Sequence, residues 1–385
     1  MENIKSESKL TFWEATSIII GHGVGSGILS VPFIAAHNSM REIILIVLFC
    51  CVFNIVLHLI IAELSLNNNG AQFISCLDRE LFSGKIKKIL TWTAFAALGM
   101  SVLFNVSAFL TGAAAVFRSW FGMPDYLGML LFYVIGAGVV FIGMKLVGIC
   151  EKIAVSSMIG VIFILFIAVL LSEKNSLPTG WHGINNALAL FSMISFSLSA
   201  VMSTPQIVKG LNGDIKKIRL SIGTGIGINT MLIFTITITT LLGAGKSISG
   251  DGALVDLAAH LGGWVSIVGY LFTLLALATS FWANTLNLRD IVSEQTHLTK
   301  NLSWLIATAP CLLIAFLSDS SFVGFTRFAS IIQVVTGVGI MIAYNLSRKR
   351  TKASPLVGKL GTVSFQITVV LCTLLASLGA MLPIK

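Results

Sequence analysis

The sequence predicts an all-α integral membrane protein with eleven transmembrane helices. Hydrophobic residues make up 56% of the 385 residues, charged residues make up only 11%, and the mean hydropathy is +0.93. A soluble chain needs roughly 25% charged residues to cover its surface, so most of this surface must face lipid. Apolar segments about 20 residues long recur along the chain. This composition excludes soluble enzymes and nucleic-acid binders.

Each apolar segment is long enough to cross a bilayer as a helix. The expected spans are 12–36, 42–66, 89–118, 126–147, 150–172, 184–208, 219–243, 263–288, 302–318, 322–346 and 360–382. Turn signals such as Asn67-Asn68-Asn69-Gly70 and Pro124-Asp125 separate them. The connections leave no room for a soluble domain, so we expect one transmembrane domain over residues 1–385.

Basic residues in short loops set the orientation of a membrane protein. If the N-terminus is cytoplasmic, nearly all Lys and Arg residues fall inside. The exceptions are Arg41, Arg118, Lys174, Lys246 and Lys385 outside and Arg327 within a span. The alternation predicts a multi-pass protein of the cytoplasmic membrane with its C-terminus outside. The net charge of +9 is scattered over loops, so it does not indicate a nucleic-acid partner.

The first span carries Gly21, Gly23, Gly25 and Gly27. Close helix packing through a GxxxG spacing is one interpretation. However, glycines two apart lie about 200° around a helix, and each costs about 1 kcal/mol relative to alanine. An unwound stretch explains all four better than one packing face does. No G-x-G-x-x-G spacing supports a phosphate loop.

The sixth span shows a second candidate break, where Ser and Thr residues from Ser195 to Thr204 precede Pro205. Irregular backbone survives at membrane depth only where protein or a cavity satisfies it. The two interrupted spans open two five-span blocks, 12–172 and 184–346. Matching breaks indicate a 5+5 inverted repeat with a binding site near the midplane. The span 360–382 is an extra C-terminal helix.

Three motifs then carry a family resemblance. They are Val24-Gly25-Ser26-Gly27-Ile28-Leu29-Ser30-Val31-Pro32, Thr204-Pro205-Gln206-Ile207-Val208-Lys209-Gly210-Leu211, and Ala278-Thr279-Ser280-Phe281-Trp282 with Leu286-Asn287-Leu288-Arg289-Asp290. Together they resemble the amino acid/auxin permease family, within the amino acid-polyamine-organocation superfamily, and look nearest to bacterial aromatic amino acid permeases. The resemblance implies the leucine-transporter fold and cation-coupled amino acid uptake.

The resemblance also implies a substrate site between the two breaks. Free amides of an unwound segment from Gly21 to Gly27 would hold the substrate carboxylate, and carbonyls of a second segment would receive the ammonium group. Phe196 would roof the site as a gate. The implied residues are Gly21, His22, Gly23, Gly25, Ser26, Gly27, Asn105, Phe196, Ser197, Leu198, Ser199 and Ala200. For Asn105 an interhelical hydrogen bond, and for His22 a structural role, remain equal alternatives.

A coupling-cation site is implied in the same way. Its oxygen ligands would be the carbonyls of Gly21, Val24 and Ala276 and the hydroxyls of Thr279 and Ser280. The alternative is that both hydroxyls cap their own helix. Some relatives carry a lysine in the fifth helix near this site. Met158 aligns there, which favours Na⁺ over H⁺ without excluding either.

Two charged residues within the spans need an explanation, because intramembrane charge often marks function. Arg327 could act as a gate, reach the outer interface, or pair with Asp319. Glu63 lies near the cytoplasmic end of its span, where a solvated carboxylate is the simplest interpretation.

The predicted function is secondary active import of a neutral amino acid with Na⁺ or H⁺. Phe281, Trp282 and Ala200 could accommodate an aromatic side chain. The alternative is a membrane sensor that binds an amino acid without net transport. No H-E-x-x-H or G-x-S-x-G motif occurs, so we do not expect an enzyme or a cofactor beyond the coupling ion. The expected partners are the substrate, the cation and membrane lipids, and the sequence does not specify an oligomeric state.

Overall fold

The structure is a computed structural model that describes residues 9–25, 27–179, 183–245, 248–249, 252–317, 322–352 and 354–382. The side chains of residues 322–336 also lie outside the description. Every described regular element is a helix. In chain order these are α1 Phe12–Val24, η1 Gly27–Leu29, α2 Val31–Ala35, α3 Met40–Asn67, α4 Phe73–Glu80, α5 Lys87–Phe121, α6 Asp125–Ile142, α7 Met144–Leu171, α8 Ile184–Ser197, η2 Val201–Ser203, α9 Thr204–Gly210, α10 Ile215–Ala244, α11 Ala253–Leu261, α12 Trp264–Thr296, α13 Lys300–Leu317, α14 Phe322–Thr351, η4 Gly358–Gly361 and α15 Val363–Gly379.

Among the described residues, eight helical segments are long and apolar enough to cross a membrane: α3, α5, α6, α7, α8 with α9, α10, α12 and α13. The bent pair formed by α1 with η1 and α2 would be a ninth. The apolar helix α15 is shorter, at 17 residues. A helix occupies each segment in which a span is predicted, and the chain is a multi-pass membrane protein.

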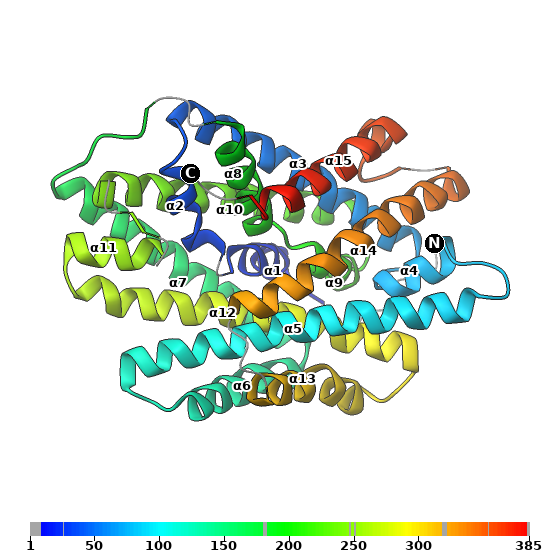
Figure 1. The fold of residues 1–385 in the computed structure, drawn as a ribbon. Coiled ribbons are helices and arrows are strands. Elements are labelled where there is room, and N and C mark those ends of the chain that lie inside the picture. The colour runs from blue at the N-terminus through cyan, green and yellow to red at the C-terminus, as the bar shows by residue number, and fades with distance from the viewer. Residues whose placement is uncertain are drawn as a thin grey trace.

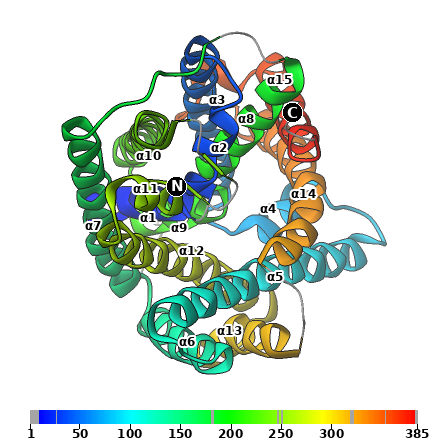
Figure 2. The same cartoon turned by 60° about the vertical axis from the view of Figure 1, so that its left-hand side comes forward.

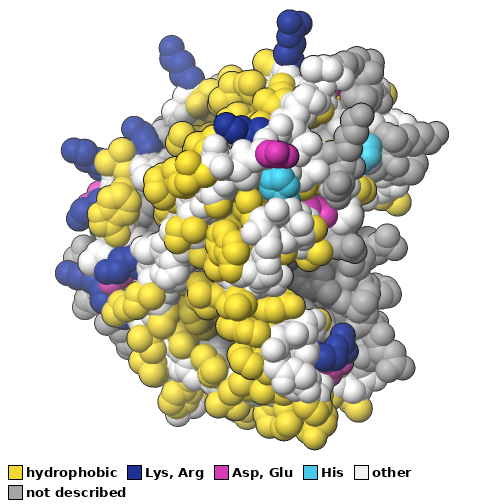
Figure 3. All heavy atoms as spheres, turned by 90° about the vertical axis from the view of Figure 1, so that its left-hand side faces the viewer, with side chains coloured by type: hydrophobic (Ala, Val, Ile, Leu, Met, Phe, Trp, Pro, Cys, Tyr) yellow, Lys and Arg dark blue, Asp and Glu magenta, His cyan; other side chains and the backbone are white. Residues whose placement is uncertain are grey.

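The broken first helix occupies the middle of the molecule. Figures 1 and 2 show α1 enclosed by other helices, with α10 and α7 on one side and α12 between it and α5. The pair α6 and α13 forms an outer layer against α5 and α12, and α15 packs along α8 and α14. On the face drawn in Figure 3, most visible side chains are hydrophobic and the few charged ones stand mostly near its margins. The broken first helix therefore lies in the interior of the helix bundle, and apolar side chains cover most of the face in Figure 3.

Two features differ from the sequence-based expectation. The boundary predicted between residues 147 and 150 lies at Gly143, where a φ of +123° ends α6 and starts α7. Only glycine adopts that conformation readily, but a single glycine in an apolar run is a weak turn signal. In addition, the connections 67–88 and 244–263 contain the short helices α4 and α11. In α4 an apolar face of Phe73, Ile74, Cys76 and Leu77 is buried.

Candidate functional site

The predicted break in the first helix is present but shorter than predicted. α1 ends after Val24, because Gly25 has a φ of +32°, and the chain resumes as η1 and α2 with a 52° bend. Gly21, His22, Gly23 and Val24 are helical, so the prediction of an unwound segment from Gly21 to Gly27 is wrong in extent. The last turn of a helix leaves its carbonyls without intrahelical partners. The carbonyl oxygens at the end of α1 are therefore available to other groups.

The break in the sixth span is also present and shifted. Leu198, Ser199 and Ala200 are non-helical between α8 and η2. Phe196 and Ser197, which the resemblance places in the substrate site, still belong to α8, so the break begins only at Leu198. Pro205 occupies the first turn of α9, where its missing N–H costs nothing.

Two buried polar side chains hold the backbone at this second break. His58 of α3 accepts the Ala200 N–H at Nε2 (2.9 Å) and donates from Nδ1 to the Asn54 carbonyl (2.6 Å). Because a carbonyl can only accept, these partners define a neutral imidazole with its proton on Nδ1. Asn229 of α10 donates to the Ser197 carbonyl at 3.0 Å. Neighbouring helices thus satisfy backbone groups that the break leaves open.

The four glycines of the first span face two different neighbours. A Cβ at Gly23 would overlap the Asn229 side-chain amide, and one at Gly27 would lie 2.6 Å from Ser197 Oγ. On the other side, a Cβ at Gly21 would lie 2.9 Å from the Thr279 Cβ. One at Gly25 would lie 3.1 Å from the Ser280 Oγ. Close packing and chain unwinding both operate here, and glycine is needed on both sides of the segment.

The predicted cation ligands are partly brought together. Thr279 Oγ1 is 2.9 Å from the Gly21 carbonyl oxygen and 2.9 Å from the Ala276 carbonyl oxygen. The first contact joins α12 to α1, and the second is the helix-capping contact that the alternative interpretation expected. Ser280 lies against Gly25. Val24 is fully buried, and no contact of its carbonyl with Thr279 or Ser280 is among the described hydrogen bonds.

His22 lies in a polar cluster on the side of α1 that faces η2 and α12. Its Nδ1 is 2.6 Å from Ser203 Oγ, and its Nε2 is 3.4 Å from Asn284 Nδ2. Asn284 also donates to the Ser280 carbonyl at 2.8 Å. The histidine is therefore hydrogen-bonded at both nitrogens, and it connects the two broken helices to α12.

The aromatic residues considered for the pocket have different environments. Phe196 is 53% exposed, and its ring would lie 3.0 Å from a Cβ at Gly27. That position beside the break is compatible with a roof. Phe281 instead packs edge-on against Phe132 of α6, with a ring separation of 5.7 Å and an interplanar angle of 87°. Phe281 thus points towards α6 and away from the glycine segment, contrary to its expected place near the substrate. Trp282 is mostly buried.

One predicted residue is not brought to this cluster, and two others cannot be placed in the described part of the chain. Asn105 is half-buried in α5, which packs on α12 and α14, and no hydrogen bond links it to α1 or α8 in the described part of the chain. Ser26 and the side chain of Arg327 lie outside the described residues.

Glu63 is buried rather than solvated, which corrects the sequence-based interpretation. Its side chain accepts from Tyr344 OH (2.8 Å) and Ser354 Oγ (2.7 Å). The other oxygen accepts from the N–H groups of Leu356 (2.8 Å) and Val357 (2.9 Å). These four donors come from α14 and the segment after it, so the carboxylate fastens that segment to α3.

Sequence reasoning missed Glu151, the acidic residue closest to the glycine segment. It is fully buried in α7, and a Cβ at Gly21 would overlap its Oε2. The predicted span began at residue 150, which put Glu151 at the membrane surface. Because α7 begins at Met144, Glu151 lies about 10 Å along the helix at 1.5 Å per residue. Met158, which aligns with the lysine of some relatives, is also buried. The ionisable residue of this helix is instead Glu151, about two turns earlier.

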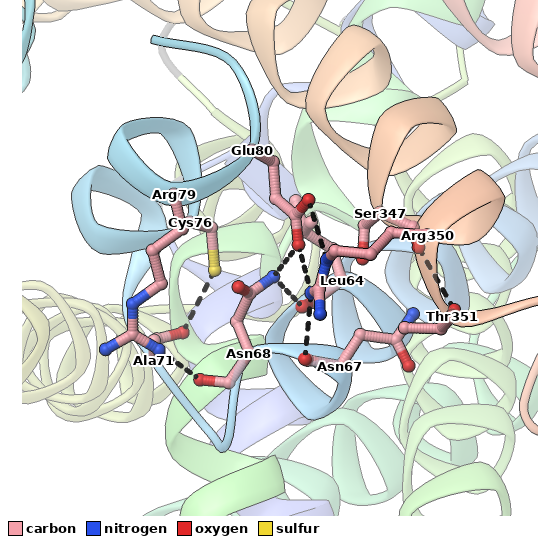
Figure 4. Close-up of polar contacts among 10 residues, drawn as sticks. All are labelled: Leu64, Asn67, Asn68, Ala71, Cys76, Arg79, Glu80, Ser347, Arg350 and Thr351. Atoms are coloured by element: carbon pink, nitrogen blue, oxygen red, sulfur yellow. Dashed lines mark hydrogen bonds and ion pairs between the residues drawn. The ribbon is translucent and has the colours of Figure 1, made fainter. Parts of the chain in front are cut away.

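A second polar region lies where α3, α4 and α14 meet. Figure 4 shows the Glu80 carboxylate between Asn68 and Arg350, and both side chains donate to it. Arg79 donates to the Asn68 carbonyl at 3.0 Å. Burial alone would raise the pKa of Glu80, but the hydrogen bonds from Arg350 and Asn68 outweigh it and hold the pKa below its usual value. The charged side chains of this region, Arg79, Glu80 and Arg350, each have a partner, which is typical of a structural junction.

Apolar spans that enclose two interrupted helices are typical of secondary membrane transporters, among them those with the leucine-transporter fold. The structure of MhsT in complex with L-phenylalanine is similar, with a TM-score of 0.72 at 15% identity over 98% of this chain and 100% of that one. The structure of Mhp1, a nucleobase-cation-symport-1 family transporter in a closed conformation with bromovinylhydantoin bound, has a TM-score of 0.62 at 14% identity over 97% of this chain and 91% of that one.

The sequence profile of the tryptophan/tyrosine permease family matches residues 8–378. The chain belongs to this family, which confirms the resemblance to aromatic amino acid permeases. No curated protein sequence matches the chain significantly.

Proposed function

We propose that this protein imports an aromatic amino acid, coupled to a cation gradient, by alternating access. The observation that carries the proposal is the contact between the two broken helices, where Gly23 and Gly27 both lie against Ser197. Interrupted helices in corresponding positions of two halves point to a substrate site between them. Membership of the tryptophan/tyrosine permease family supports an aromatic substrate, as does the phenylalanine bound to the similar MhsT.

The substrate is proposed to lie between the end of α1 and the end of α8. Backbone amides after Val24 would bind its carboxylate, because N–H groups at the start of a helical segment favour an anion. Carbonyls near Leu198 would receive its ammonium group. Phe196 would cover the side chain, which its exposure and its position beside Gly27 support.

The proposed topology has eleven spans in two inverted blocks, 12–172 and 184–346, with the N-terminus in the cytoplasm. Its support is the loop charge alternation and the position of α1 and α8 at the start of each block. Cysteines placed at the exposed Asn69 and Asn212 should react only with reagents from the cytoplasmic side. One placed at the exposed Lys174 should react only from outside. The reverse pattern would contradict the orientation.

Uptake into vesicles tests the function. The purified chain, reconstituted into liposomes, should exchange and accumulate labelled tryptophan, tyrosine or phenylalanine and should leave alanine and lysine outside. Accumulation should require an inward Na⁺ or H⁺ gradient. Saturable binding with neither exchange nor accumulation would favour the sensor over the transporter, and absence of binding to all three aromatic amino acids would refute both.

A further inference from the structure

A polar cleft lies where α4 meets the C-terminal end of α12. Two overlapping cavities form it, the larger of about 330 Å³, a volume within the range of small-molecule sites. Both cavities are lined by Ser75, Arg79, Glu294 and His297. Every other lining residue except Ala71 is polar or charged. In the proposed topology this cleft opens to the cytoplasm.

Glu294 presents an unpaired carboxylate to the cleft. Its Oε2 accepts from the Gln72 N–H at 2.9 Å and from the Ser75 hydroxyl at 3.0 Å. Its other oxygen has no hydrogen-bond partner among the described residues, and none of them forms an ion pair with Glu294. The two hydrogen bonds hold the carboxylate in place at the wall of the cleft, and its second oxygen is available to a ligand.

Arg79 provides the opposite charge in the same cleft. Its Nη1 donates to the Asn68 carbonyl at 3.0 Å, and its other guanidinium N–H groups have no partner among the described residues. Figure 4 shows this guanidinium on the other side of Asn68 from Glu80, so Arg79 takes no part in the pairing of that carboxylate. Arg79 and Glu294 line both cavities, but they form no ion pair with each other.

We propose that this cleft binds a free α-amino acid through its ammonium and carboxylate groups, as a regulatory site on the cytoplasmic side. The ammonium group pairs with Glu294, and the carboxylate pairs with the planar guanidinium of Arg79, whose geometry suits carboxylates. Asp78, the third charged lining residue, is already paired with Lys87 at 3.2 Å. A simple cation or anion satisfies only one of the two unpaired charges, whereas a zwitterion satisfies both. Because the lining is polar, the cleft recognises the zwitterion rather than an aromatic side chain, and alanine is expected to bind.

Hydrogen bonds join this cleft to the broken sixth span. Gln72, whose N–H is bound to Glu294, accepts at its side-chain oxygen from Asn287 Nδ2 at 3.0 Å. The same Asn287 nitrogen donates to the Met202 carbonyl of η2 at 2.7 Å. Since η2 directly follows the break, a ligand that fixes Glu294 also restrains the broken span and slows the movement that alternating access requires. This regulatory role rests on the proposed function, because the amino acid would inhibit its own further import.

Equilibrium binding tests the site without transport. The purified chain in detergent is dialysed against labelled alanine, which should bind saturably. Glycine should compete, whereas ethylamine and acetate carry one charge each and should compete at least about tenfold less well. Absence of saturable alanine binding would overturn the inference even where aromatic amino acids are transported. Binding of glycerophosphoethanolamine without binding of alanine would identify a lipid headgroup as the ligand and would also overturn it.

Variants then test the two charges. Glu294→Gln keeps an oxygen for the Gln72 N–H and the Ser75 hydroxyl but removes the charge, so it should weaken alanine binding at least about tenfold. Arg79→Gln should have an effect of similar size. Glu80→Gln neutralises the neighbouring carboxylate outside the cleft and should bind alanine like the parent. The two cleft variants are separate tests if one cannot be purified, and unchanged binding in either would overturn the inference.

Uptake into vesicles tests the regulatory role. Alanine enclosed in the vesicles should slow the initial uptake of labelled phenylalanine about fivefold in the parent, the lower end of usual allosteric coupling. It should have no such effect in Glu294→Gln, and the two proteins should transport equally without alanine. Equal slowing in the parent and Glu294→Gln, or none in either, would overturn the regulatory role. Alanine binding by a chain that transports no aromatic amino acid would instead refute the proposed function and leave the binding site standing.

Discussion

Glu63 and Glu151 are both fully buried glutamates inside apolar helices, yet their surroundings are opposite. Glu63 accepts four hydrogen bonds from α14 and the segment after it. Glu151 accepts none from the described residues and faces the end of α1. All four hydrogen-bond donors to the Glu63 carboxylate are groups of the protein itself. Neither oxygen of the Glu151 carboxylate has a hydrogen-bond partner among the described residues.

This difference separates a structural charge from a functional one. A satisfied buried carboxylate stabilises one arrangement of helices, and removing it leaves its donors unpaired. A buried carboxylate without partners contributes a cost, so removing it leaves no donor unpaired. The two regions should therefore respond oppositely to substitution.

The largest effect is expected at the glycine segment beside Glu151. Gly25→Leu should abolish uptake, a loss of at least about a thousandfold or roughly 4 kcal/mol. A side chain there would need a left-handed φ and would meet Ser280 Oγ at 3.1 Å. Gly160→Leu in α7, where nothing lies within 4 Å of an added Cβ, is the matched control. Vesicle uptake is measured after membrane insertion is verified, and normal transport by Gly25→Leu would remove this segment from the site.

The next largest effect distinguishes the two carboxylates by stability. Glu63→Gln should lower the free energy of unfolding by about 3 kcal/mol, because the amide presents donors to the N–H groups of Leu356 and Val357. Glu151→Gln should be as stable as the parent or more so, since neither oxygen of Glu151 has a hydrogen-bond partner among the described residues. Denaturant or thermal unfolding in detergent measures both. Equal destabilisation by the two substitutions would contradict the distinction between them.

The contrast also shows what the sequence could predict. Apolar length and turn residues located the membrane-crossing helices. A glycine cluster located the first interruption, and a run of Ser and Thr residues before Pro205 located the second. Burial of Glu63 and Glu151 could not be inferred, because it depends on which helices cover each carboxylate. For Glu151 a helix boundary misplaced by about six residues moved it to the membrane surface, and the actual boundary rests on the conformation of Gly143 alone. His58 and Asn229 were missed as backbone partners because they lie on other helices far along the chain.

A smaller effect is expected at the hydroxyls of α12. Thr279→Ala should raise the half-saturating cation concentration about tenfold, the usual consequence of losing a hydrogen-bonding group to a charge. Ser280→Ala should act in the same direction and less strongly, because Ser280 lies beside Gly25 rather than between two carbonyls. Thr285→Ala is the control, since that hydroxyl bonds only within its own helix, to the carbonyls of Phe281 and Trp282. Uptake is measured as a function of cation concentration. Identical curves for Thr279→Ala and Thr285→Ala would mean that the Thr279 hydroxyl, like that of Thr285, only caps its own helix.

The smallest effect concerns the junction of α3, α4 and α14. The pKa of Glu80 is held below its usual value by Arg350 and Asn68 despite partial burial. A carboxylate with a lowered pKa contributes stability that is complete above its unfolded-state pKa, about 4.3 for glutamate. That contribution is lost as the pH falls through the lower folded-state value. Because the Arg350 side chain is 55% exposed, the pair is worth at most about 1 kcal/mol.

Glu80→Gln should therefore lower the melting temperature slightly at neutral pH and should converge with the parent as the pH falls below about 4. Cation titrations of this variant should match those of the parent at every pH, because Glu80 lies at the junction with α14 and not beside α1. A shift in cation affinity on Glu80→Gln would mean that the two regions communicate. In that case the paired carboxylates of the α3–α14 junction would belong to the transport cycle, and the division between structural and functional charge would not hold for this fold.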